Sequence, residues 1–219
     1  MKKTFGLAIP ATINYINDLE NLLENISHQS EKPDEISISI SEIDNYYPEK
    51  NYGLNLIITC HKDKKNGATN RNIAAQKLNT DLISFFDCDD LMHPKRIEII
   101  KKSFDENNIN GLVHDFDISK DVDFKNQEFS FENFKKQEFQ NYNLFLDIIN
   151  TISSKHLFPV DENSQFSYHN AHLTVLREIF EKYKYDETHH FPDSLYNRTL
   201  VQNGIKISFL KHKLSYYNL

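Results

Sequence analysis

The chain of 219 residues has no tryptophan, five glycines and two cysteines, and it contains no long apolar run. A membrane-spanning helix needs ~20 consecutive apolar residues, so we expect a soluble protein with at most peripheral membrane contact. Lys2 and Lys3 followed by the apolar run Phe5–Ile9 resemble a secretory signal. However, Pro10 and the polar residues after it cut this run short, so we interpret it as part of a first β-strand.

Few cysteines and a mild acidic charge exclude two further classes of protein. Cys60 and Cys88 cannot form a disulfide framework, and both end strands that we expect to be buried, where a reduced thiol fills space. A cytoplasmic location fits this pattern. The 25 basic and 32 acidic side chains give a net charge of −7, with no basic stripe beyond Lys62–Lys65. This argues against nucleic-acid binding, so an anionic substrate would be held locally by a metal ion or a few donors.

Strands and helices alternate along the first half of the chain. The expected strands are Thr4–Ile9, Glu35–Ser41, Leu54–Cys60 and Asp81–Phe86, and the expected helices are Tyr15–His28 and Thr69–Leu78. The strands are short and mostly apolar, which indicates burial on both faces. We therefore predict an α/β fold in which helices cover both faces of a mostly parallel sheet.

The second half of the chain is less regular. A helix over Pro94–Asn107 and a strand over Gly111–Phe116 precede a polar and aromatic stretch, and a helical stripe of apolar residues then runs from Tyr142 to Ile152. The expected later elements are a strand-like Ser167–Val175, helices Leu176–Lys184 and Asp193–Asn203, and a strand Ile205–Leu210. No linker separates these segments, so we expect one compact domain.

An acidic turn, Asp87-Cys88-Asp89-Asp90, directly follows the last strand of the first half. Ligands of parallel sheets lie beyond the carboxyl ends of the strands, where this turn should meet the turns Pro10–Asn14 and Ser41–Asp44. Mg²⁺ and Mn²⁺ prefer oxygen ligands, and a short acidic turn leaves coordination positions open for a diphosphate. The alternative is that the aspartates cap the next helix. Pro94 as the first residue of that helix would instead place the cap near His93.

The segment Asn66–Ala75 precedes the acidic turn and contains Gly67, Arg71 and Asn72; Pro192-Asp193 and a helix closed by Gly204 follow it. The order and spacing of these segments and of the acidic turn, from about residue 4 to residue 217, resemble those of the GT-A-fold, family 2-like nucleotide-sugar glycosyltransferases. The resemblance implies a Rossmann-like GT-A sheet and a variable acceptor-side region. It also implies one domain, residues 1–219, with a nucleotide-sugar-binding half (1–116) and an acceptor-binding half (117–219).

The resemblance further implies a metal-dependent transfer of a sugar from a nucleotide donor to a glycan or other hydroxyl acceptor. Asp87 would bind the ribose or base edge, Asp89 and Asp90 would hold Mn²⁺ or Mg²⁺, and Arg71 would face the nucleotide. The family often places a carboxylate after its second strand, and Ser41, Glu42 and Asp44 are all candidates for that position. The identity of the nucleobase therefore stays open, with UDP as the first expectation. The candidate donor-binding residues are Pro10, Ala11, Thr12, Glu42, Gly67, Arg71, Asp87 and Cys88.

Asp193 matches the second residue of an acidic pair in this family, so it is the candidate base, and the resemblance together with Asp193 implies inversion at the sugar carbon. Pro192 stands where the family usually has an acid, and an aspartate at a helix start is also a good N-cap. His212 and His190 are candidates for a third ligand to the metal or phosphate. The absence of tryptophan excludes the Gln-x-x-Arg-Trp motif of the processive synthases.

Three other functions share parts of this pattern. Aspartyl phosphotransferases carry Asp-x-Asp after a strand, but normally after the first one. Sugar-nucleotide pyrophosphorylases need a glycine-rich loop after the first strand, and Pro10–Asn14 contains no glycine. A glycosyltransferase-like domain that binds its donor without turnover is the third alternative, and Pro192 favours it.

Overall fold

The computed structural model describes residues 2–117, 157–159, 167–189 and 192–217. The expected helical stripe from Tyr142 to Ile152 and the candidate ligand His190 lie outside these ranges. The strands are β1 (Phe5–Thr12), β2 (Glu35–Ser41), β3 (Leu56–His61), β4 (Leu82–Phe85), β5 (Leu91–Met92), β6 (Gly111–Asp117), β7 (Leu157–Pro159), β8 (Ser167–His169), β9 (Thr174–Leu176) and β10 (Ile207–Tyr216). The α-helices are α1 (Ile16–Ser27), α2 (Gly67–Lys77), α3 (Arg96–Glu106), α6 (Arg177–Lys182) and α7 (Pro192–Gln202).

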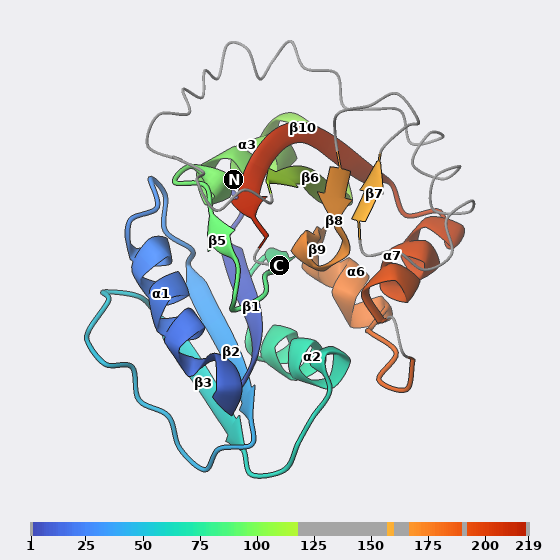
Figure 1. Ribbon diagram of the computed structural model, residues 1–219. Coiled ribbons are helices and arrows are strands. Elements are labelled where there is room, and N and C mark those ends of the chain that lie inside the picture. The colour runs from blue at the N-terminus through green and yellow to red at the C-terminus, as the bar shows by residue number, and fades with distance from the viewer. Residues whose placement is uncertain (1, 118–156, 160–166, 190–191, 218–219) are drawn as a thin grey trace.

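One mixed sheet forms the centre of the molecule, with the strand order β3-β2-β1-β4-β9-β6-β10-β5 (Figure 1). The pairs β3–β2, β2–β1, β1–β4 and β6–β10 are parallel. Strand β9 runs antiparallel between β4 and β6, and β5 runs antiparallel along β10. A separate pair, β7–β8, lies outside this sheet. The prediction of a mostly parallel α/β sheet is therefore confirmed.

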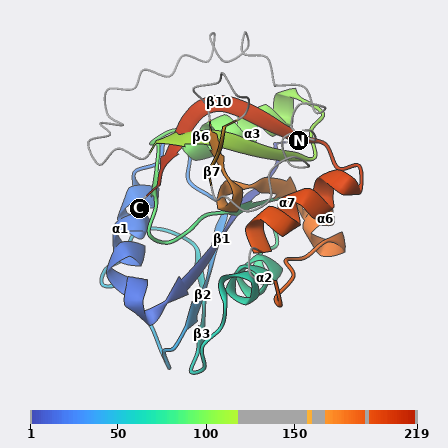
Figure 2. The ribbon, with the colours of Figure 1, turned by 45° about the vertical axis from the view of Figure 1, so that its right-hand side comes forward.

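Helices cover the sheet from both sides, with α1 on one side of β1 and β2 and with α2, α6 and α7 on the other (Figure 2). Apolar side chains of α1 and α3 share one buried cluster with Ile36, Ile38 and Ile40 of β2. The other cluster joins α2, α6 and α7 to Ile83 and Phe85 of β4. Successive strand residues point to opposite faces, so each face contributes to its own core.

The polar face of β2 fixes the start of α2 over the sheet. Strand β2 alternates isoleucine with serine, and its serines lie beneath α2. The Ser39 hydroxyl donates to Asn70 Oδ1 (3.0 Å), while Asn70 Nδ2 donates to the Ala11 carbonyl (3.1 Å) and to Ser41 Oγ (3.3 Å). One buried amide thus ties α2 to the carboxyl ends of β1 and β2, because each of its groups finds a partner.

Several boundaries differ from the sequence-based expectations. Strand β1 continues to Thr12, and Pro10 stays in parallel register with Ser39. The expected turn over Pro10–Asn14 is therefore wrong: the chain leaves the strand only at a 3-10 turn, Ile13–Tyr15. Proline fits an extended backbone and removes only one N–H group, so it does not end the strand here.

The regions around α3 and β9 also differ. Helix α3 begins at Arg96, with Lys95 rather than His93 at its cap position and no side-chain capping bond. Leu91–Met92 forms the short strand β5, which the sequence did not predict, because a strand this short depends on its partner β10. The expected strand Ser167–Val175 is interrupted by a 3-10 turn at Asn170–His172. Within the described ranges, none of the helices has the length and apolarity needed to cross a bilayer.

Candidate active site

The acidic turn lies at the carboxyl edge of the parallel strands, beyond β4. Ala8 and Phe85 are partners in the β1–β4 ladder, and the Phe86 N–H donates to the Ala8 carbonyl (3.2 Å). The Asp90 N–H then donates to the Asp87 carbonyl (3.4 Å), which closes the turn. Parallel strands place their carboxyl ends at one edge, so the turn lies beside the end of β1.

Arg71 of α2 joins this turn to the start of α7. Its Nη2 lies 2.5 Å from Asp87 Oδ1, and its Nη1 lies 2.9 Å from Asp193 Oδ1. Only 8% of the Arg71 side chain is exposed, against 21% for Asp87 and 19% for Asp193. Burial alone would lower the pKa of Arg71, but the charges of Asp193 and Asp87 outweigh it and raise that pKa. The guanidinium is therefore positioned between the two carboxylates, and its direct contact with a nucleotide stays a prediction.

Gly67 leaves the space that this arginine occupies. A Cβ atom at Gly67 would lie 3.0 Å from Arg71 Nη1, which is tighter than most such contacts. Gly67 is also the first residue of α2, whose N-cap Asn66 accepts a hydrogen bond from the Thr69 N–H. The glycine predicted from sequence to contact the donor thus has a second use, since it allows the guanidinium to approach the helix start.

The segment before α7 is attached to α2 by Glu187. The Asn72 amide donates to Glu187 Oε1 (2.9 Å) and to the Tyr185 carbonyl (3.0 Å), and the Thr69 hydroxyl donates to Glu187 Oε2 (3.0 Å). Asn66 Nδ2 donates to the Glu187 carbonyl (2.6 Å). These bonds fix the approach to Asp193. We name Asn72 and Glu187 the Asn72–Glu187 clamp; its two residues stand 115 apart in sequence, and no local pattern relates them.

The members of the acidic turn have different surroundings. Asp89 is partly buried, and burial together with the charge of Asp87 raises its pKa. Cys88 belongs to the buried cluster that contains apolar side chains of α1 and α3, and burial raises the pKa of its thiol well above the ordinary value. The Cys88 side chain therefore faces the interior, so its predicted contact with the donor would use backbone atoms.

Asp90 is fully buried, and its carboxylate faces away from solvent. Asp90 Oδ2 lies 2.8 Å from His172 Nε2, and His172 Nδ1 lies 2.8 Å from Ser215 Oγ on β10. The His172 ring also stacks on Phe86, with 4.4 Å between ring centroids. The structure thus places Asp90 in a contact that supports the turn, while its predicted role as a metal ligand is untested.

The predicted donor residues at the ends of β1 and β2 lie at the same edge. Pro10 and Ala11 are buried in β1, so they offer backbone atoms, whereas Thr12 is partly exposed. Glu42 directly follows β2 and has a φ of 68°, the left-handed region that a non-glycine residue rarely adopts. Such strain is often found at functional sites.

The β2–β3 loop after Glu42 is attached to α1 by Glu20. The Tyr46 and Tyr52 hydroxyls donate to the two Glu20 carboxylate oxygens, each at 2.5 Å, and the Glu49 N–H donates at 3.1 Å. Glu20 itself is buried. Because this carboxylate is satisfied by three donors, it holds the loop in one position against the helix.

A hard divalent cation fits the chemistry of the acidic turn. Among the residues that the structure describes, no group of three or more His, Cys, Asp and Glu side chains is arranged to hold a metal ion. His212 is half-buried on β10 and lies near His93; burial lowers its pKa. Mg²⁺ in enzymes is commonly held by one or two carboxylates and completed by substrate phosphates and water. Asp89, which is partly exposed at the turn, supplies such a carboxylate.

Sequence reasoning missed one residue near this turn. Burial, followed by the charges of Asp90, Asp87, Asp89 and Asp193, raises the pKa of Tyr217. No motif marks Tyr217, because its position depends on the register of β10.

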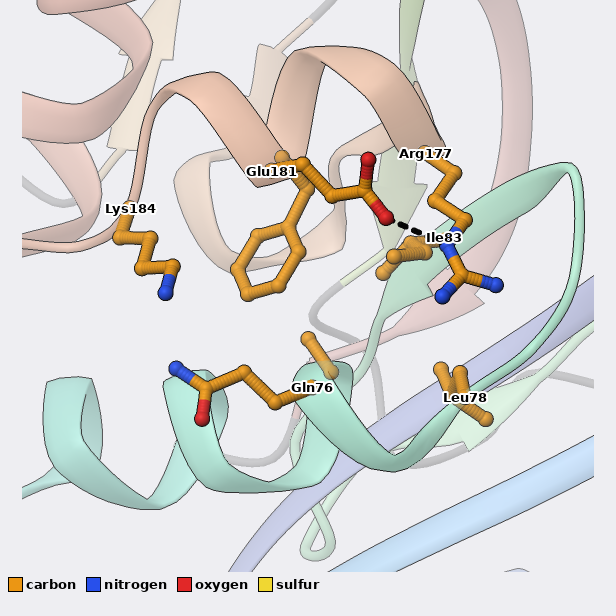
Figure 3. A pocket seen from close by; sticks show the side chains of 8 residues that line it. Gln76, Leu78, Ile83, Arg177, Glu181 and Lys184 are labelled. Carbon is orange, nitrogen blue, oxygen red and sulfur yellow. Dashed lines mark hydrogen bonds and ion pairs between the residues drawn. The ribbon is translucent and has the colours of Figure 1, made fainter.

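A separate pocket of about 180 Å³ between α2 and α6 contains none of the predicted site residues (Figure 3). Its lining residues are Ala75, Gln76, Leu78, Ile83, Arg177, Phe180, Glu181 and Lys184.

The family profile described as Glycosyl transferase family 2 matches residues 8–165, which is more than half of the chain. The chain therefore belongs to glycosyl transferase family 2, a family of enzymes, and the resemblance stated from the sequence is confirmed. No curated protein sequence matches the chain.

Solved structures with the same fold include glycosyltransferases. S. aureus TarS 1–349 has a TM-score of 0.68 and 17% identity, over 98% of this chain and 60% of that structure's chain. TarS in complex with UDP-GlcNAc gives 0.69 and 16%, over 99% and 58%. The mannosyltransferase PcManGT from Pyrobaculum calidifontis, in complex with GDP-Man and Mn²⁺, gives 0.60 and 14%, over 97% and 55%. These identities support the GT-A fold alone, and the chain spans less than two thirds of each of these structures.

Proposed function

We propose that the protein transfers a sugar from a nucleotide-sugar donor to a hydroxyl of a glycan or other acceptor, with inversion at the sugar carbon. The observation that carries this proposal is the position of Arg71 between Asp87 and Asp193. It brings the donor side of the site, at the acidic turn, next to the candidate base at the start of α7. In a glycosyl transfer the departing diphosphate and the base act on the same sugar, so these two sides of the site must lie close together.

The donor would lie over the carboxyl ends of β1 and β2. In this proposal Asp87 and Glu42 recognise the nucleoside, the backbone of Pro10, Ala11 and Cys88 lines the site, and Thr12 and Gly67 complete it. TarS has been solved with UDP and UDP-GlcNAc, and PcManGT with GDP-Man, which supports a nucleotide sugar as the class of donor. A UDP-sugar remains our first choice.

Asp89 is our candidate for holding Mn²⁺ or Mg²⁺, with Asp90 supporting the turn and His212 a candidate third ligand. The bound cation would stabilise the negative charge that builds on the departing nucleoside diphosphate. Mn²⁺ in the PcManGT complex supports this choice of cation. The raised pKa of Asp89 fits the same role, because burial and the charge of Asp87 make a counter-cation favourable there.

Asp193 would accept the proton of the acceptor hydroxyl as that oxygen attacks the sugar carbon. Attack from the face opposite the departing diphosphate inverts the anomeric configuration. During this step the sugar carbon becomes oxocarbenium-like, as in glycoside hydrolysis. The Asn72–Glu187 clamp would keep the segment before Asp193 against α2. In the same proposal, residues 1–116 bind the donor and residues 117–219 bind the acceptor, in a cytoplasmic setting.

Release of nucleoside diphosphate from UDP-, GDP- and dTDP-sugars with Mn²⁺ tests the proposal. We expect release with at least one donor, and we expect Asp89→Asn to reduce the rate by roughly 100-fold or more. Asp63→Asn is the matched control, because Asp63 is an exposed aspartate that pairs only with Lys65 in the described contacts. Absence of release with every donor would favour a domain that binds without turnover. A product that keeps the donor's anomeric configuration by NMR would contradict inversion.

A further inference from the structure

The C-terminal strand β10 brings Tyr217 alongside the acidic turn. In the antiparallel β5–β10 ladder, Met92 pairs with Ser215 and Leu91 pairs with Tyr216. Asp90 immediately precedes Leu91, so the next step of the same ladder places Tyr217 beside Asp90. The position follows from strand register alone and needs no motif in the sequence.

The side chain of Tyr217 lies on the face of β10 that is directed at the turn. Ser215 faces this way, since its hydroxyl contacts His172, which in turn contacts Asp90. Strand residues alternate between faces, so Tyr217 shares the face of Ser215, and Tyr216 occupies the opposite one.

Two further contacts fix the ring of Tyr217. Its N–H donates to the Asp117 carbonyl at 2.7 Å, which continues the β6–β10 pairing beyond the last strand residue. Its ring meets the edge of Phe116, with ring centroids 6.0 Å apart and planes at 82°. Phe116 pairs with Ser215 in the same ladder, so this contact independently places Tyr217 on the Ser215 face.

The phenol is a proton donor in this environment. Burial, followed by the charges of Asp90, Asp87, Asp89 and Asp193, raises the pKa of Tyr217 above the ordinary value of a phenol. A neutral O–H group can donate a hydrogen bond to an anion without adding charge to the site. It lies within the field of both the candidate metal ligand and the candidate base.

We propose that Tyr217 is a further catalytic residue, whose hydroxyl donates a hydrogen bond to the diphosphate of the donor as the sugar–phosphate bond breaks. This inference rests on the proposed glycosyl transfer. A diphosphate at this edge adds negative charge beside several carboxylates, so a fixed neutral donor is valuable there. The hydrogen bond strengthens as charge develops on the departing group, and such a bond increases kcat more than it changes donor affinity.

Tyr217→Phe removes this hydroxyl and keeps the ring against Phe116. We expect kcat for donor turnover to fall roughly 10- to 100-fold while KM for the donor changes less than about threefold. Tyr216→Phe is the matched control: it removes the same atom from the neighbouring residue on the opposite face, so kcat and KM should stay within about twofold of the wild type. Equal thermal unfolding midpoints for the two variants would show that both are folded.

The outcomes separate this inference from the proposed function. A wild-type protein without turnover of any nucleotide sugar contradicts the proposed function, and the role of Tyr217 falls with it. An active wild type together with a Tyr217→Phe variant of equal kcat contradicts only the role of Tyr217. A Tyr217→Phe variant whose KM for the donor rises while kcat is unchanged also overturns the role, because the hydroxyl would then bind the donor equally before and during cleavage of the sugar–phosphate bond.

Discussion

Asp87 and Asp193 share one guanidinium, that of Arg71, although they lie in different halves of the chain. The first follows β4 and the second begins α7, so the donor side and the base side of the proposed site are joined through a helix that belongs to neither. A buried cation between two partly buried carboxylates is costly to remove, because both carboxylates would lose a charged partner. The contacts of Arg71 therefore hold the two sides of the proposed site together.

Arg71→Met tests how much the contacts of Arg71 with the two carboxylates stabilise the fold. We expect the free energy of unfolding in urea to fall by about 3 kcal/mol, because two carboxylates lose their buried partner. Arg177→Met is the control, since the Arg177 side chain is 34% exposed and contacts Glu181 and Asn79, and ion pairs near the surface contribute under about 1 kcal/mol. A similar loss for both variants would show that the contacts of Arg71 stabilise the fold no more than those of Arg177.

Gly67→Ala should destabilise the protein, against the ordinary preference of helices for alanine. The added methyl group would press on the Arg71 guanidinium, and we expect a loss of about 1 kcal/mol together with lower activity. In an Arg71→Ala background the same change should become neutral or stabilising, because alanine is then the better helix former. Equal effects in both backgrounds would disprove the steric explanation.

The Asn72–Glu187 clamp can be measured with a double-mutant cycle. Asn72→Ala and Glu187→Ala should each lower kcat, because the segment before Asp193 loses its attachment to α2. The unfolding free energies should be non-additive by about 1 kcal/mol, as expected for two groups that share hydrogen bonds. Glu181→Ala serves as a control on α6, where no clamp exists. Additive effects for Asn72 and Glu187 would contradict a direct interaction.

Alkaline titration tests the attachment of the β2–β3 loop. Burial, with the hydrogen bond to Glu20, raises the pKa of both Tyr46 and Tyr52. The folded protein therefore holds these protons more tightly than the unfolded chain, and stability should decline as the pH rises above about 10, the pKa of a free tyrosine. The double variant Tyr46→Phe and Tyr52→Phe should show a weaker decline. Identical pH profiles would rule out this coupling.

The sequence predicted the parts of the site that depend on local order. The strand before Asp87, the helix that carries Arg71 and the helix that begins near Asp193 each have their own apolar pattern or end signal. The rule that ligands collect at the carboxyl ends of parallel strands then placed the acidic turn at the correct edge. These elements lie within a few residues of their expected bounds.

The remaining features depend on pairing between distant segments, which local patterns do not encode. Nothing in the sequence relates Asn72 to Glu187, or Asp90 to His172, and the register of β10 alone places Tyr217 near the turn. Neighbouring aspartates look equivalent in sequence, yet Asp90 is buried against His172 while Asp89 stays partly exposed. Strand β1 was predicted too short because Pro10 looks like a strand end until its partners are known.

Calorimetric titration of UDP and of GDP, each with and without Mn²⁺, is the decisive test of a cation-assisted diphosphate site at the acidic turn. We expect at least one nucleotide to bind roughly tenfold or more tightly with Mn²⁺, and we expect Asp89→Asn to remove this gain while Asp63→Asn keeps it. Equal affinity with and without the cation for both nucleotides, or a gain that survives in Asp89→Asn, would contradict such a site.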